Sequence, residues 1–332
     1  MSLQFHELGD VALQCGVTLP KTRLGFETYG ELNPARTNAI LVPTWYAGQH
    51  SDARWLIGND RALDPRKFFI VVVNILGNGV SSSPSNQPAP FDRVRFPVVS
   101  ILDNVLVQDR LLRERFGVKH LRLVFGRSMG AQIAFQWASW FSDRVKALLA
   151  LAGSARTAIH NYVFLQSVKM SLTSGADWAR GEYDAIPVDT LSRMWLIFDS
   201  WGLSQAFYRH RTYEKLGFKT VGDFLAREKP VRDPNDLLAQ VSTWERADIS
   251  TNGRFNGNLS EALGAIRARS IVMPSRTDLY FPPEDSELEV ERMPSAELRV
   301  LESEWGHRAG APGSDPADID FIDRALRDLL EQ

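Results

Sequence analysis

The sequence predicts an α/β fold in which a mostly parallel sheet carries helices on both faces and a helical insertion interrupts the core. Short apolar runs alternate with longer amphipathic runs in the first half of the chain, and this rhythm indicates strand–helix–strand units with right-handed crossovers. It stops near residue 156 and resumes after residue 263. Because no Gly/Ser- or Pro-rich linker divides the chain, we expect one core (residues 1–155 and 264–332) with a helical lid inserted at residues 156–263.

The core strands are predicted at short runs that are apolar and often β-branched, as strands buried on both faces should be. They cover residues 39–43 (AILVP), 68–74 (FFIVVVN), 121–125 (LRLVF), 146–152 (KALLALA), 268–273 (ARSIVM) and 297–301 (ELRVL). Core helices are predicted at residues 101–116, 129–140 and 317–330; in the first of these, apolar residues recur on one side and charges on the other. In the lid, the aromatic-rich runs 162–172 and 190–198 are predicted to be helical, and no strand is expected.

The composition argues against several classes of protein. The 332 residues include 38 Lys and Arg against 40 Asp and Glu, a formal charge of −2, which disfavours a basic nucleic-acid face or a polybasic membrane anchor. The apolar run at residues 68–73 is far shorter than the roughly 20 residues that span a bilayer. The single cysteine, Cys15, fits a reducing compartment, and the first residues lack a signal-peptide pattern. We therefore expect a cytoplasmic protein that binds neither nucleic acid nor membrane.

The most informative segment joins a predicted strand to a predicted helix. Residues 126–130 read Gly-Arg-Ser-Met-Gly, a G-x-S-x-G pattern in which a sharp turn exposes the hydroxyl of Ser128. The flanking glycines leave room for the neighbouring strand and helix. Alone, the pattern arises by chance in about one chain in ten of this length, so its position between strand and helix is what makes it specific. We predict that Ser128 is a nucleophile.

A nucleophilic serine needs a base, and the base needs an orienting acid. Asp278 follows the strand predicted at 268–273, and His307 follows the strand predicted at 297–301. Both therefore lie at the edge of the sheet where Ser128 lies, in the chain order Ser, Asp, His that is typical of α/β-hydrolases. We predict that these three residues form a catalytic triad.

Three rivals fit these roles less well. His50 follows an early strand, but a solvated loop position suits it better. Asp285 falls inside the next predicted helix, and Asp103 lies in a helix where a solvated or capping role is expected.

The loop after the strand at 39–43 reads PTWYAG, residues 43–48. In this arrangement a backbone N–H of that loop and the N–H after the nucleophile stabilise the oxyanion. We expect the donors to be the amides of Met129 and Trp45, with the amide of Tyr46 as the alternative to that of Trp45. The side chains of Trp45 and Tyr46 either wall the acyl pocket or pack in the core, and the sequence favours neither.

Motifs for other chemistries are missing. Gly77-Asn78-Gly79 lacks the third glycine of a dinucleotide-binding fingerprint, and no P-loop, H-E-x-x-H or C-x-x-C pattern occurs. We expect no cofactor and no metal ligands.

From about residue 25 to the C-terminal helix, the chain resembles the homoserine O-acetyltransferase family. The shared segments are FETYGELNPARTNAILV, FFIVVVNILGNGVSSSPS, FPVVSILDNV, GRSMGAQIAFQWA, GADWARGEY, LSRM, TDLYFPP and WGH. The resemblance implies an α/β-hydrolase core with a helical lid, and a triad at Ser128, Asp278 and His307.

The chain departs from that family in three places. The family's elbow usually reads G-G-S-M-G-G, whereas Arg127 stands here; aspartate usually follows the catalytic histidine, whereas Arg308 does here; and PTWYAG replaces an H-A-L-T-G type loop. The resemblance implies that an acid beside the histidine meets an amino group, so Arg308 reverses the charge where an amino-acid acceptor would bind. The departures favour an esterase relative over a true acetyltransferase, with Tyr46, Arg127 and Arg308 as substrate-binding residues.

We therefore expect a carboxylic ester hydrolase that acts on small, acetate-like acyl esters through an acyl-enzyme. The alternative is a homoserine O-acetyltransferase with an acyl-CoA donor, and a third hypothesis is a non-catalytic binding module of the same fold. The expected partner is a small-molecule ester. The oligomeric state stays open, with any homodimer contact expected through the lid.

Overall fold

The computed structural model describes residues 2–331, and it contains a single eight-stranded sheet. Its order is β1-β2-β4-β3-β5-β6-β7-β8. The hairpin of β1 and β2 is antiparallel and also pairs antiparallel with β4, whereas every pair from β4 to β8 is parallel. The predicted, mostly parallel sheet is confirmed. The strand bounds are Gln4–Ala12 (β1), Thr18–Tyr29 (β2), Ala39–Pro43 (β3), Phe69–Val73 (β4), Leu123–Arg127 (β5), Ala147–Leu151 (β6), Arg269–Met273 (β7) and Ala296–Leu298 (β8).

Alternate residues of the central strands enter two separate hydrophobic cores, one on each face of the sheet. Leu41 and Val124 belong to the first core, and Ile40 and Phe125 to the second, because successive side chains of a strand point to opposite faces. Helices α1 (Ile101–Phe116), α2 (Met129–Trp140) and α8 (Leu259–Gly264) pack into the first core. The 3₁₀ helix η1 (His50–Leu56) and α10 (Pro316–Leu330) pack into the second. Helices on both faces are thus confirmed.

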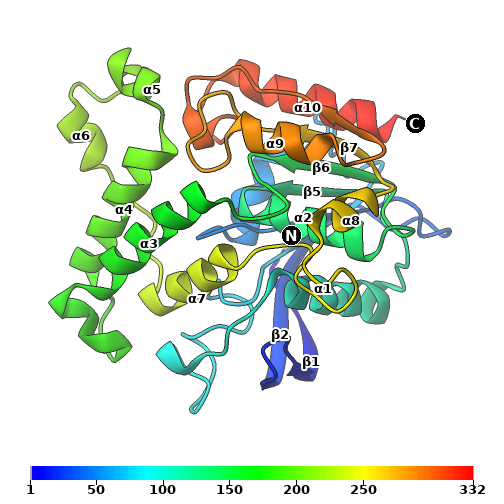
Figure 1. Cartoon of the computed structure of the whole chain (residues 1–332), viewed down its shortest axis with the longest axis horizontal. Helices are drawn as coiled ribbons and strands as arrows, with labels where there is room; N and C mark the ends of the chain where they lie inside the picture. Colours follow the sequence, from blue (N-terminus) through cyan, green and yellow to red (C-terminus); the bar gives the residue numbers. More distant parts are fainter. Residues whose placement is uncertain (1, 332) are drawn as a thin grey trace.

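All helices between β6 and β7 except α8 gather beside one end of the sheet, on the left of Figure 1. In chain order they are α3 (Ile159–Thr173), η3 (Ala176–Gly181), α4 (Val188–Gly202), α5 (Gln205–Arg209), η4 (Thr212–Leu216), α6 (Val221–Leu225) and α7 (Pro234–Glu245). Residues 249–263, which the prediction counted with the lid, include most of α8, and α8 contacts α2 of the core. The division into core and lid remains a prediction. Three further short helices are η2 (Arg93–Arg95), α9 (Pro283–Val290) and η5 (Gly306–Arg308).

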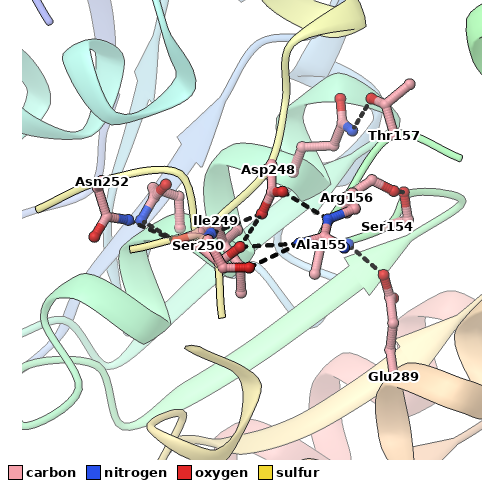
Figure 2. A network of polar contacts seen from close by, with 12 residues as sticks. Ser154, Ala155, Arg156, Thr157, Asp248, Ile249, Ser250, Asn252 and Glu289 are labelled. Atoms are coloured by element: carbon pink, nitrogen blue, oxygen red, sulfur yellow. Dashed lines mark hydrogen bonds and ion pairs between the residues drawn. The ribbon is translucent and has the colours of Figure 1, made fainter. Parts of the chain in front are cut away.

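The segment before α3 and the segment after α7 run side by side (Figure 2). The Ile249 amide donates to Ala155 O at 3.1 Å, and the Thr157 amide donates to Ala247 O at 2.9 Å. An ion pair joins Arg156 Nε to Asp248 Oδ2 at 2.6 Å. These contacts join the two connections of the helical region into one attachment. Within residues 2–331, no helix is long and apolar enough to cross a membrane.

Candidate active site

Ser128 occupies the sharp turn between β5 and α2 in a strained backbone conformation. Its φ of 56° and ψ of −130° are rare for a residue other than glycine. The turn is held at both sides: the Ser128 amide donates to Leu151 O at 2.9 Å, and the Ala131 amide donates to Ser128 O at 2.8 Å. The predicted strand–turn–helix context of the motif is confirmed.

Three glycines let other backbone segments approach this turn. A Cβ at Gly126 would lie 2.2 Å from Gly130 O, and one at Gly153 would lie 2.6 Å from Ser128 O. A Cβ at Gly130 would lie 2.8 Å from Pro43 O, in the segment that leaves β3. The last contact matters for the site, because it brings the first turn of α2 against the loop that carries Trp45.

The three residues of the predicted triad meet at the carboxyl edge of the sheet. His307 Nε2 lies 2.8 Å from Ser128 Oγ, and His307 Nδ1 lies 2.7 Å from Asp278 Oδ2. All three are buried, with His307 exposed by only 8%. Their convergence is what the sequence predicted, and their catalytic role remains a prediction.

The second oxygen of Asp278 fixes the acid in place. Asp278 Oδ1 accepts hydrogen bonds from the amides of Tyr280 at 2.7 Å and Phe281 at 3.3 Å, which is the local turn that aspartate favours. The other oxygen, Oδ2, can thus accept a hydrogen bond from the Nδ1–H group of His307. That tautomer leaves Nε2 as an acceptor for the Ser128 hydroxyl.

The predicted oxyanion donors are backbone amides without an acceptor among residues 2–331. This holds for Met129, at the first turn of α2, and for both Trp45 and Tyr46. The first amides of a helix have no intrahelical partner and carry its positive dipole end. Because the amides of Trp45 and Tyr46 are equally free, the choice between them stays open.

A cavity of about 340 Å³ opens over the Ser128 and His307 side chains. The three predicted substrate-binding residues, Tyr46, Arg127 and Arg308, all line it. The ring of Tyr46 stacks on Phe198 of α4 with centroids 5.1 Å apart, so Tyr46 both packs in the core and walls the cavity. The other residues that line the cavity are Trp45, Ala47, Gly48, Asp52, Trp195, Phe198, Asp199, Gly202, Arg227, Glu228, Lys229, Pro230, Arg232, Trp244 and Tyr280.

The charged residues nearest the triad are unusually desolvated. Burial, together with the neighbouring positive charge of Arg308, lowers the pKa of Arg127 to about 10. Burial also lowers the pKa of Arg308. Arg127 Nη2 donates to the backbone oxygen of His307 at 2.7 Å, which ties the residue before the nucleophile to the base.

The rival residues lie elsewhere. His50 Nδ1 contacts the Asn74 amide group at 3.2 Å and is outside the cavity lining. Asp285 is in α9, as expected, and lines a different hollow. Asp103 caps α1 by accepting from the Ser100 amide at 2.8 Å, so its capping role is confirmed.

Sequence reasoning missed a charged cluster that α4 brings to the cavity. Asp199 pairs with Arg227 at 2.7 Å and also with Lys229. An aspartate on a helix otherwise rich in apolar residues is indistinguishable, in sequence, from a solvated one. The sequence signal that could have indicated a buried Asp199 was its place between Phe198 and Trp201, two aromatic residues that pack against the core.

Comparison with known proteins agrees with this architecture. A family model described as alpha/beta hydrolase fold matches residues 40–310. The ethyl acetate hydrolase of Pseudomonas veronii is 37% identical over 97% of this chain and 94% of its own length. The homoserine O-acetyltransferase of Methanococcoides burtonii is 30% identical over 93% of this chain and 70% of its own. The crystal structure of an acetylester hydrolase from Corynebacterium glutamicum is similar with a TM-score of 0.97 and 35% identity, covering 100% of this chain and 96% of that one.

Proposed function

This chain belongs to the alpha/beta hydrolase family, and we propose that it is a carboxylic ester hydrolase that acts on small, acetate-like acyl esters. Two relatives support this substrate class: one is named an ethyl acetate hydrolase and the other an acetylester hydrolase. The observation that carries the proposal is the unbroken chain of hydrogen bonds from Asp278 through His307 to Ser128, at 2.7 and 2.8 Å.

In the first half of the reaction, Ser128 Oγ attacks the ester carbonyl carbon while His307 Nε2 takes the hydroxyl proton. Asp278 stabilises the imidazolium that forms. The amides of Met129 and Trp45, or of Tyr46 in its place, bind the developing oxyanion, and each such donor contributes about 3 kcal/mol in the transition state. The carbon–oxygen bond to the alcohol then breaks, the alcohol leaves with the proton from His307, and the acyl group stays on Ser128.

In the second half, water replaces the alcohol. His307 takes a proton from the water, which attacks the acyl carbon, and Ser128 recovers its proton as the carboxylic acid leaves. Hydrolysis and acyl transfer share the first half and differ only in the group held for this second attack.

A single set of assays tests the proposal. The purified protein is given ethyl acetate and longer-chain ethyl esters, and then acetyl-CoA with and without homoserine. We expect ester turnover that homoserine leaves unchanged. Labelling by a serine-reactive phosphonate, one per chain and lost in Ser128→Ala, is expected as well, and its absence would support a non-catalytic binding module.

The second candidate is a homoserine O-acetyltransferase, which the 30% identical relative favours. The cationic Arg308, directly after the proposed base and lining the cavity, disfavours it because homoserine carries an ammonium group. Efficient, homoserine-dependent release of CoA would falsify the esterase proposal in favour of this candidate.

We further propose that the enzyme works in the cytoplasm, in keeping with its single cysteine, and forms a homodimer through its lid. Large apolar side chains are exposed on α3 and α4, and they support this contact: Ile159, Tyr162, Val163, Met170, Val188 and Leu196.

A further inference from the structure

Two guanidinium groups, those of Arg127 and Arg308, line the cavity at the proposed catalytic centre. Neither Arg127 nor Arg308 makes an ion pair with a carboxylate of residues 2–331, although both line the cavity. Arg127 is buried, at 7% exposure, and its Nε has no hydrogen-bond partner in the part of the chain described. The Arg308 guanidinium, which is partly buried, makes no hydrogen bond with residues 2–331. Desolvated cations of this kind are costly unless something pairs with them.

The rest of the cavity adds positive charge instead of removing it. Its lining holds five cationic side chains against three carboxylates. Asp199 is already shared by Arg227 and Lys229, and Asp52 lies 3.5 Å from Arg232. Two of the three carboxylates are therefore committed to other cations, and the third, Glu228, is exposed to solvent. The lining keeps an excess of positive charge.

The position of Arg308 identifies the part of the substrate that it faces. In the proposed reaction His307 Nε2 hands its proton to the leaving oxygen, so the alcohol portion of the ester must lie beside His307. Arg308 is the next residue on η5 and lines the cavity together with His307. The acyl carbon, by contrast, lies at Ser128 and the free amides.

We propose that Arg308, supported by the positive charge of Arg127, binds a carboxylate on the alcohol portion of the substrate, so that the preferred esters are acetates of small hydroxy acids. This inference rests on the proposed function and narrows its substrate class. A planar guanidinium matches a carboxylate through two parallel hydrogen bonds, and a carboxylate would neutralise charge that the protein leaves unpaired.

Matched substrates test the proposal. Acetoxyacetate carries the carboxylate, and isobutyl acetate is its uncharged isostere. We expect wild-type kcat/KM to be at least about 10-fold higher for acetoxyacetate, as a charge-assisted hydrogen bond implies. In Arg308→Met this ratio should fall about 10-fold or more, and Arg308→Lys should keep part of it. Because both esters are measured on one preparation, loss of folded protein cancels in the ratio.

A control variant and an inhibition measurement distinguish failure of the carboxylate site from failure of the proposed function. Arg267→Met removes an exposed arginine paired with Asp143 and should leave the ratio unchanged. On the wild type, glycolate should inhibit at a concentration at least about 10-fold lower than isobutanol, its uncharged isostere. A wild-type ratio near one, or a ratio that Arg308→Met leaves unaltered, overturns the carboxylate site. Failure of the wild type to hydrolyse either ester overturns the proposed function itself.

Discussion

Backbone groups, more than other side chains, hold the proposed catalytic residues in place. Asp278 Oδ1 accepts from two consecutive amides, and the Ser128 amide donates to β6. The Gly306 amide, directly before His307, donates to Thr277 Oγ1 at 3.1 Å. Because the backbone holds these residues, a substitution that removes one reacting side-chain atom should abolish ester hydrolysis without disturbing the fold.

We expect Ser128→Ala to lower kcat/KM for ethyl acetate by at least about 10⁴-fold, because the variant lacks the hydroxyl that is hydrogen-bonded to His307 Nε2. Far-UV circular dichroism and the melting temperature should be close to those of the wild type. Ser275→Ala is the matched control, since its buried Oγ has no partner within residues 2–331, and it should keep activity within about threefold. Substantial activity in Ser128→Ala would show that the nucleophile is wrongly assigned.

We expect Asp278→Asn to lower kcat by about 10⁴-fold, because an amide at this position no longer selects the imidazole tautomer that accepts the Ser128 proton. Stopped-time assays at saturating ester measure the loss. Asp285→Asn serves as the comparison, since Asp285 was the rival acid and lies in α9. Equal losses of kcat in the two variants would contradict the assignment of Asp278 as the acid of the triad.

Among the strands, those buried on both faces were predicted most closely, and those at the edges of the sheet least closely. Most residues of the strands β3 to β7 are apolar and buried, so their runs were found within two residues of their bounds. The hairpin β1–β2 went unpredicted because one side of it is exposed and its pattern is interrupted by glycine and lysine. The edge strand β8 is shorter than predicted, ending at Leu298, because its residues are only partly buried and offer no continuous apolar run.

The packing of α2 against the loop after β3 sets the proposed oxyanion site. Gly130→Ala would place a Cβ 2.8 Å from Pro43 O and 3.1 Å from Thr44 O, directly before Trp45. We expect kcat to fall about 100-fold, as when one oxyanion donor is displaced, with a smaller effect on KM. Gly253→Ala, where an added Cβ meets nothing within 4 Å, should be neutral. An unchanged kcat in Gly130→Ala would argue against a donor in this loop.

The attachment of α9 to the segment that follows β6 should make stability depend on pH. Burial raises the pKa of Glu289 from 4.5 to about 8, and its Oε1 accepts from the Ala155 amide at 2.6 Å (Figure 2). The folded state therefore keeps a proton that the unfolded state releases above pH 4.5, so this group destabilises the fold as pH rises from about 4.5 to about 8.

Glu289→Gln removes that proton release. As the pH rises from 5 to 8, the free energy of unfolding should fall in the wild type. In the variant, we expect this fall to be smaller by on the order of 3 kcal/mol. Denaturant titrations at the two pH values measure the difference. The exposed neighbour change Glu291→Gln should follow the wild type. Parallel pH slopes in Glu289→Gln and the wild type would contradict a buried neutral carboxyl.

The whole chain combines a core that holds the proposed triad with helices that close the cavity over it. The triad was predictable because each member follows a parallel strand, and such strands end at a common edge. The cavity charge was predictable only in part. Arg127 and Arg308 adjoin the motif residues and were named. Asp199 reaches the cavity on α4, and its partners Arg227 and Lys229 reach it on the segment after α6; local sequence does not specify this packing.

The same helices offer the apolar surface proposed for self-association. Ile159, Val163 and Met170 are exposed by 85%, 55% and 68%, and their spacing puts them on one face of α3. Scattered exposed apolar residues are ordinary, but a stripe on one helix is typical of an interface. A second copy of the chain would cover it.

Light scattering on the purified protein should therefore give twice the chain mass of 37.4 kDa. Changing Val163 and Met170 together to Glu places two charges in the contact and should return the mass to that of one chain. Leu288→Glu adds a charge at a similarly exposed apolar position on α9, outside the lid, and should remain dimeric. A wild type that scatters as a single chain at micromolar concentration, or a double variant that stays dimeric, rules out dimerisation through α3. Because Val163 and Met170 do not line the cavity, the monomeric variant should still hydrolyse ethyl acetate, which separates assembly from chemistry.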